Sequence, residues 1–165
     1  MSQFERTAYW AEMAGWMVLI YCLSGDSFAY SRTLIALQYW SSVFHLPLTE
    51  ADLQLINLTL RKTAHVTEYF ILGLLLYRAL SGGLISFRFS LACWALAGGG
   101  SYALADEFHQ WFTKLRTPSL GDSCLDFSGV IASQVWTLIR SSMFQAGGWS
   151  AWLRKARLDA GSLKH

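Results

Sequence analysis

The stretch DEFHQWFTKLRTPSLGDSCLDFSG, residues 106–129, gathers much of the ionisable chemistry of this chain between two apolar segments. A shorter polar stretch, RKTAHVTEY at residues 61–69, also adjoins an apolar run. Charged groups beside long apolar segments are costly to place in a bilayer, so they are retained mainly where they pair or serve a function. The two stretches therefore guide the prediction of both the helices and the functional site.

The composition of the 165-residue chain predicts a single domain associated with a membrane. Hydrophobic residues make up 53% of the chain and charged residues 15%, whereas soluble globular domains carry about 25% charged residues. The mean hydropathy of +0.30 reflects polar loops between a few very apolar runs. A net charge of +2, scattered along the chain, does not indicate nucleic-acid binding. The expected partner is the lipid bilayer.

Four apolar segments predict an all-α integral membrane protein with four transmembrane helices, at about residues 8–24, 63–80, 89–105 and 120–139. About 20 residues are needed to cross a bilayer. The second segment reaches that length only if His65 and Glu68 lie within one leaflet and Arg78 extends its charged end to the other face. A cleavable signal peptide is the alternative for the first segment, but a strongly basic start and a clear cleavage site are lacking.

The region before the second span has a different pattern. Residues 33–49 are uncharged but contain several polar groups, which a lipid-facing helix tolerates poorly. An interfacial or re-entrant helical segment is therefore predicted over about residues 28–60. Thr49 and Asp52 form a capping-box pattern, which predicts a short helix leading into Arg61. After the four-helix domain of residues 1–140, residues 141–165 predict a basic amphipathic cytoplasmic tail on an anionic membrane surface.

The distribution of basic residues predicts the orientation of the four spans. Eight Lys and Arg residues lie on the side of both termini and five on the other side. This excess favours a protein of the plasma (inner) membrane with cytoplasmic termini. Both polar stretches then meet at the extracytoplasmic face.

The cysteines indicate neither a disulfide framework nor a zinc site, because their number is odd and no CxxC spacing occurs. Cys22, Cys93 and Cys124 lie in or beside apolar runs. They are expected to be buried, inert thiols.

Helical spacing predicts which polar side chains share a face. His65 and Glu68 are three residues apart, with Lys62 one turn earlier. Two further faces are expected, one with Asp106, His109 and Gln110, and one with Asp122, Asp126 and Gly129. Taken singly, each residue is explained as an interfacial hydrogen-bonding group, and Asp122 as a helix N-cap. Taken together at one membrane face, they predict a functional polar site rather than a salt-bridge network that locks the bundle.

In these residues, the sequence resembles the VanZ-like family of small polytopic membrane proteins. The matching blocks are RKTAHVTEYFILGLLL at 61–76 and the stretch at 106–129, with LSGDS at 23–27 as a weaker block. Lys114 and Leu115 depart from the Pro-Gly that is common in the family. The family pattern falls on Lys62, His65, Glu68, Tyr69, Asp106, Glu107, His109, Gln110, Arg116, Asp122, Asp126 and Gly129.

The resemblance implies a link to low-level resistance to teicoplanin, a lipoglycopeptide that targets cell-wall precursors, but it specifies no reaction. With the spacing, it gives two groups of candidates. The catalytic candidates are His65, Glu68, Asp106, Glu107 and His109. The substrate-binding candidates are Lys62, Tyr69, Gln110, Arg116, Asp122 and Asp126.

Three functions remain open. The first is an enzyme acting on an outer-leaflet lipid headgroup or cell-wall precursor, with His65 or His109 as general base, Glu68 or Asp106 orienting it, and Arg116 binding phosphate. A divalent metal held by some catalytic candidates would supply the same chemistry through bound water, although no HExxH motif occurs. The second is a non-enzymatic protein that sequesters or shields a drug, precursor or partner protein. The third, a transporter or channel subunit, is disfavoured because charge clusters at one face.

Overall fold

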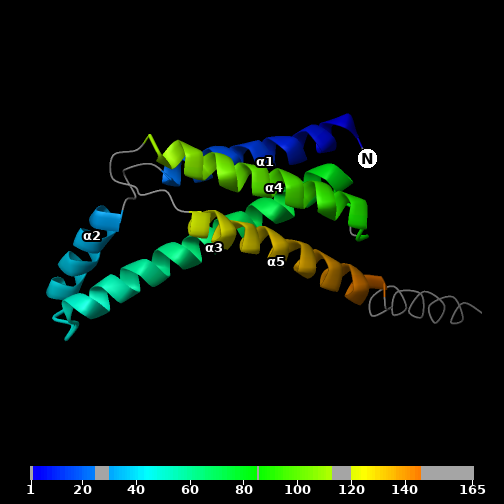
Figure 1. Cartoon of the computed structure of the whole chain (residues 1–165). Coiled ribbons are helices and arrows are strands. Elements are labelled where there is room, and N and C mark those ends of the chain that lie inside the picture. Colours follow the sequence, from blue (N-terminus) through cyan, green and yellow to red (C-terminus); the bar gives the residue numbers. More distant parts are fainter. Residues whose placement is uncertain (1, 25–29, 85, 113–119, 146–165) are drawn as a thin grey trace, which may run out of the picture.

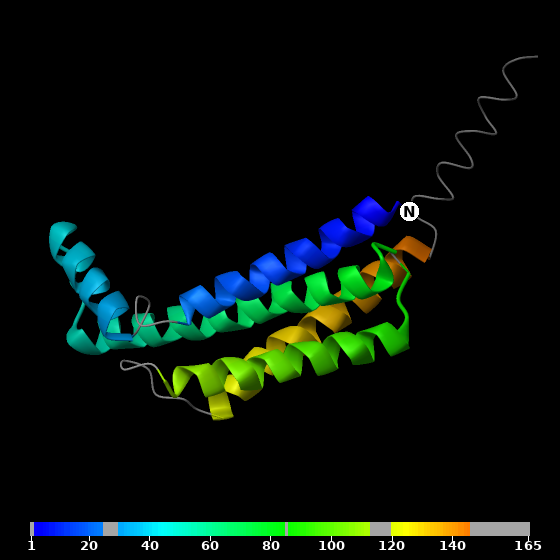
Figure 2. The same cartoon turned by 90° about the horizontal axis from the view of Figure 1, so that it is seen from above.

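One long helix contacts all the other helices of the structure. The computed structural model describes residues 2–24, 30–84, 86–112 and 120–145, and within them it contains helices and no strand. Helix α3 packs against its four partners, as Figures 1 and 2 show. The helices are α1 (Gln3–Leu23), α2 (Tyr30–Val43), α3 (Glu50–Ser81), α4 (Phe89–Gln110) and α5 (Leu120–Gln145).

Helix α3 begins and ends at residues that the sequence marks. Its N-terminus is a capping box, in which the Thr49 hydroxyl accepts from the backbone N–H of Asp52 and the Asp52 carboxylate accepts from that of Thr49. Gly82, in the left-handed conformation at φ 65°, ends the helix. The predicted capping box is thus confirmed. The predicted division into a short helix before Arg61 and a separate span after it is wrong, because no Gly or Pro interrupts residues 50–72 and the helix continues.

The all-helical prediction is confirmed for the described residues, and each predicted apolar segment corresponds to one helix. No helix in these residues combines the length and the apolar character that a membrane crossing requires. Residues 146–165, which include most of the predicted basic tail, lie outside the described residues.

Small residues let α5 approach α3 and α4 closely. A methyl group added at Gly129 of α5 would lie 2.5 Å from the Val66 carbonyl oxygen of α3. One added at Gly99 of α4 would lie 2.8 Å from methyl groups of Val130. Gly129, which the spacing predicts on one face with Asp122 and Asp126, is therefore part of a helix-packing surface. The core around it consists of Ile20, Tyr69, Leu72, Ala103 and Val130.

The burial pattern of the described residues reverses that of an ordinary soluble bundle. Buried positions include many polar or charged side chains, among them Asn57, Asp106, Asp126 and Ser133. Large apolar side chains are exposed along the outer faces, for example Trp94 at 68% and Phe89 at 76%. The prediction of buried cysteines is wrong, since all three are free and exposed. Sequence alone did not distinguish a buried apolar face from an exposed one.

Helices α2 and α3 form a hairpin whose tip lies away from the rest of the bundle. α2 lies beside the first half of α3, while α1, α4 and α5 run along its second half (Figures 1 and 2). The Thr33 hydroxyl donates to Asn57 Oδ1 at 2.6 Å and links the two arms. The C-terminal ends of α1 and α4 and the N-terminal end of α5 lie at the end of the bundle nearest this hairpin (Figure 1). The described parts of the two polar stretches are thereby brought together.

Candidate functional site

A pocket of about 420 Å³ lies where α1, α2 and α3 meet. Its size falls within the range of about 300–1,000 Å³ that is typical of small-molecule sites. Most of its wall is apolar, and the polar side chains come mainly from α3. The lining residues are Leu23, Ser24, Thr33, Ala36, Leu37, Trp40, Asn57, Leu60, Arg61, Ala64, His65 and Glu68.

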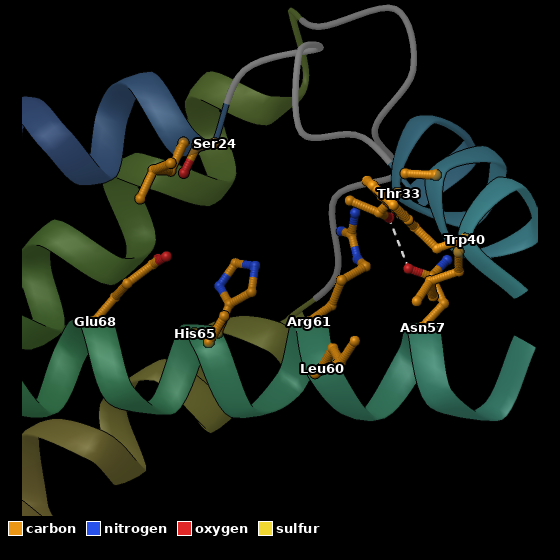
Figure 3. Close-up of a pocket in the computed structure, with 12 residues that line it drawn as sticks. Ser24, Thr33, Trp40, Asn57, Leu60, Arg61, His65 and Glu68 are labelled. Atoms are coloured by element: carbon orange, nitrogen blue, oxygen red, sulfur yellow. Dashed lines mark hydrogen bonds between the residues drawn. The ribbon is translucent and has the colours of Figure 1, made fainter. Parts of the chain in front are cut away.

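A single face of α3 supplies the polar wall of this pocket. Asn57, Arg61, His65 and Glu68 follow one another at intervals of four, four and three residues, which aligns them along the helix. Figure 3 shows these side chains rising from the same side of α3. Lys62 is exposed and does not line the pocket. The cation of this stretch that reaches the pocket is therefore Arg61.

His65 is held from behind by a carboxylate of another helix. Its Nδ1 lies 3.0 Å from Oδ1 of Asp126 on α5, and the Asp126 side chain is fully buried. In the neutral imidazole, an Nδ1–H that donates to Asp126 leaves Nε2 as a proton acceptor. The pair thus has the arrangement of a general base oriented by a buried acid. The sequence analysis predicts Glu68 or Asp106 as the group that orients the base, and Asp126 as a substrate-binding residue. The structure instead places Asp126 beside His65.

Asp106 belongs to a second polar group behind the pocket wall. Its Oδ2 accepts hydrogen bonds from the Ser24 hydroxyl at 2.8 Å and from Gln110 Nε2 at 3.3 Å. Ser24 also lines the pocket. Because Asp106 is 3% exposed, it contacts the pocket through Ser24 rather than directly. The structure thus joins the end of α1 to the polar end of α4.

The other candidates of the two stretches are packed around these groups. Tyr69 is fully buried against Tyr102, and its hydroxyl has no hydrogen-bond partner among the described residues. Glu107 is buried, and the His109 ring lies against that of Tyr21, tilted by 31° with ring centroids 4.1 Å apart. None of these three side chains lines the pocket.

Two further predictions concern residues at the edge of the described chain. Arg116 lies outside the described residues, and Asp122 is partly buried on the first turn of α5. Where the chain is described, no group of three or more His, Cys, Asp or Glu side chains is arranged to hold a metal ion. Of the candidates predicted from the sequence, the structure brings His65 and Glu68 to the pocket wall and places Asp126 behind His65.

Sequence reasoning missed four polar residues of the pocket, namely Ser24, Thr33, Asn57 and Arg61. The interval from Asn57 to Glu68 was a usable signal, because it continues the helical face of His65 for two more turns. The predicted separate segment over about residues 28–60 divides this face and therefore conceals the signal. Thr33 and Ser24 come from other helices, so only the tertiary structure shows their position.

The whole site lies within the part of the chain that matches a known family. Residues 9–140 match the family VanZ/LLP1, which covers well over half of the chain and all of the pocket. No curated protein and no solved structure matches the chain significantly. The chain belongs to the VanZ/LLP1 family.

Proposed function

We propose that this protein is an integral protein of the plasma membrane that acts on the polar headgroup of a lipid or lipid-linked cell-wall precursor by acid–base chemistry. Exposed large apolar side chains along α1, α4 and α5 support a lipid environment for the outer faces. The excess of basic residues on the side of the termini supports cytoplasmic termini. The pocket would then open toward the extracytoplasmic leaflet.

The observation that carries the proposed chemistry is the contact between His65 and Asp126 at the wall of an amphiphilic pocket. The Nε2 atom of His65 would take a proton from a water molecule or hydroxyl group that attacks an ester group of the headgroup, and the imidazolium would return that proton to the oxygen that leaves as the ester bond breaks. The Asp126 carboxylate would stabilise the imidazolium that forms. Arg61 would face an anionic part of the headgroup, displacing or sharing the interaction that it already makes within the protein.

The proposed chemistry would also account for the low-level teicoplanin resistance that the family name implies. Teicoplanin carries a lipid tail and meets its precursor targets at the outer membrane surface. A protein that alters an amphiphile in that leaflet would change how much target the drug can reach. The effect on drug tolerance is accordingly expected to depend on His65.

A second function is favoured by the apolar walls of the pocket. Leu23, Leu37, Trp40 and Leu60 give the pocket the character of a binding site that holds an amphiphile without changing it. Such a protein would sequester or shield a precursor, a drug or a partner protein. It would need the shape and charge of the pocket, but not a proton acceptor at His65.

Replacing His65 distinguishes the two functions. Cells expressing His65→Asn are expected to lose the teicoplanin tolerance that the wild-type protein confers, while the purified variant stays folded. His45→Asn is the matched control, because His45 is exposed in the loop between α2 and α3 and its φ of 50° suits Asn. Full tolerance in His65→Asn would contradict the acid–base proposal and leave the binding function.

A further inference from the structure

We propose that the pocket takes a phosphate ester with a long hydrocarbon chain, and that the chain lies between α2 and α3 while the phosphate lies at Arg61 and His65. This inference rests on the proposed function, because it names the class of substrate for the same site. The apolar part of the pocket would bind the hydrocarbon chain, and the charged part would bind the phosphate.

The first support is the separation of charge within the pocket. Its ionisable lining residues, Arg61, His65 and Glu68, occupy adjacent turns of α3. The wall contributed by α2 contains Ala36, Leu37 and Trp40 and has no charged group. Figure 3 places Trp40 beside Asn57, at the far end of the row from Glu68. A ligand that fits both parts has one charged end and one apolar end.

The second support is that the two polar side chains at the apolar end, Thr33 and Asn57, are already hydrogen-bonded to each other. The Thr33 hydroxyl donates to Asn57 Oδ1 at 2.6 Å, and Asn57 is fully buried. A pair that is already hydrogen-bonded has little need of a polar ligand group. The walls beside it, formed by Leu37, Trp40 and Leu60, are suited to methylene groups.

The third support is the chemistry of the charged end. The planar guanidinium of Arg61 matches the geometry of phosphate oxygens. His65 is one turn further along the helix, with Asp126 fixing its ring from behind. The ester group of a phosphate bound at Arg61 would then lie near His65, the proposed base, which is on the same face of α3.

Photolabelling in lipid nanodiscs tests the inference with a defined probe. The probe is dodecyl phosphate carrying a diazirine near the chain end, and the matched reagent is the same diazirine chain with an alcohol in place of phosphate. The phosphate probe is expected to label residues of α2 and α3 that line the apolar end, Leu37, Trp40 and Leu60. The alcohol is expected to give only the diffuse labelling of lipid-facing surfaces.

Two pairs of variants locate the chain and the phosphate. Ala36→Phe fills the apolar end, and Ile35→Phe, next to it but outside the pocket lining, is its control. Arg61→Gln removes the cation, and Arg32→Gln on the exposed surface of α2 is its control. Pocket labelling is expected to fall about fivefold or more in Ala36→Phe, as overpacking a site predicts, and not in Ile35→Phe. It is also expected to fall in Arg61→Gln and not in Arg32→Gln.

Equal pocket labelling in Ala36→Phe and Ile35→Phe would overturn the inference, as would equal labelling of these residues by the alcohol and the phosphate. His65→Asn separates this result from the proposed function. Because Arg61 also holds the phosphate, His65→Asn should weaken pocket labelling by the phosphate probe without abolishing it, and such residual labelling with lost teicoplanin tolerance supports both. Retained labelling with full tolerance would contradict acid–base chemistry while the substrate class stands. Lost tolerance in His65→Asn without any pocket labelling in the wild type would contradict the substrate class alone.

Discussion

The His65 imidazole and the Asp126 carboxylate lie 3.0 Å apart although 61 positions separate them in the chain. The contact joins the two polar stretches of the sequence across the packed pair of helices α3 and α5. It requires Gly129, one turn after Asp126, because a side chain there would hold α5 away from α3. Packing and site chemistry are therefore coupled through the same segment of α5.

Asp126→Asn is expected to reduce the function of the site by about 100-fold or more, as the loss of acid–base assistance predicts. The amide has nearly the shape of the carboxylate, but it cannot stabilise an imidazolium by its charge. The measurement is teicoplanin tolerance, together with the pH profile of any activity found on a lipid phosphate. Asp122→Asn, one turn earlier and outside the pocket lining, is the comparison. A positioning role predicts a displaced pH profile in Asp126→Asn, whereas an unchanged profile would indicate a structural role only.

Gly129→Ala is expected to destabilise the folded protein by about 1–3 kcal/mol, the usual effect of overpacking. The added methyl group would lie 2.5 Å from the Val66 carbonyl oxygen and 3.1 Å from the Phe70 nitrogen. Thermal unfolding in detergent measures the effect. Gly15→Ala is the control, because nothing lies within 4 Å of a methyl group there. Equal melting temperatures for the two variants would contradict the close approach of α5 to α3.

The charge of Asp52 is expected to stabilise the N-terminus of α3 in a pH-dependent way. Hydrogen bonds from the side chain and backbone of Thr49 lower the pKa of Asp52 below its ordinary value of 3.8. A lowered folded-state pKa gives stability that is complete above the ordinary value and is lost as pH falls through the folded value. The stability difference between wild type and Asp52→Asn should therefore be present at neutral pH and shrink in acid. A difference that is constant with pH would contradict this role.

Arg61 and Lys62 are expected to differ sharply although they are neighbours. Arg61 lines the pocket, and Lys62 is exposed outside it. Arg61→Gln should reduce retention of a lipid phosphate in nanodiscs, measured by native mass spectrometry, while Lys62→Gln should leave it unchanged. The reverse result would show that the anion binds on the other side of α3.

The proposed topology predicts that a cysteine placed at Thr117, in a variant without the three native cysteines, reacts with an impermeant reagent added to intact spheroplasts. Removal of the native thiols is needed because Cys22, Cys93 and Cys124 are exposed. Residue 117 lies between α4 and α5, which places it on the side opposite both termini in the four-span topology. Labelling only after permeabilisation would contradict the orientation of the site.

The sequence predicted those parts of the structure that depend on local pattern. The helices, the capping box at Thr49 and the shared face of Asp122, Asp126 and Gly129 each follow from residues close together in the chain. The continuity of α3 past Arg61 was not predicted, because the helix capped at Thr49 and the apolar span from residue 63 were treated as two separate elements. The exposure of the cysteines was missed because apolar runs do not show which face packs inward.

The site itself was predicted in composition but not in pairing. His65, Glu68 and Asp126 were named as candidates, yet the partner of His65 depends on the register of α5 against α3, which no local pattern specifies. Ser24 and Thr33 enter the pocket from helices on either side of the segment at 25–29. Their roles depend on tertiary contacts with Asp106 and Asn57.

A double-mutant cycle between His65 and Asp126, read out as teicoplanin tolerance at matched protein levels, tests whether the two residues act together. If Asp126 acts through His65, then His65→Asn, Asp126→Asn and the double variant should lose similar amounts of function, because the second change removes nothing further. Effects of the two single variants that add in the double variant would contradict the central claim that the two residues form one functional unit.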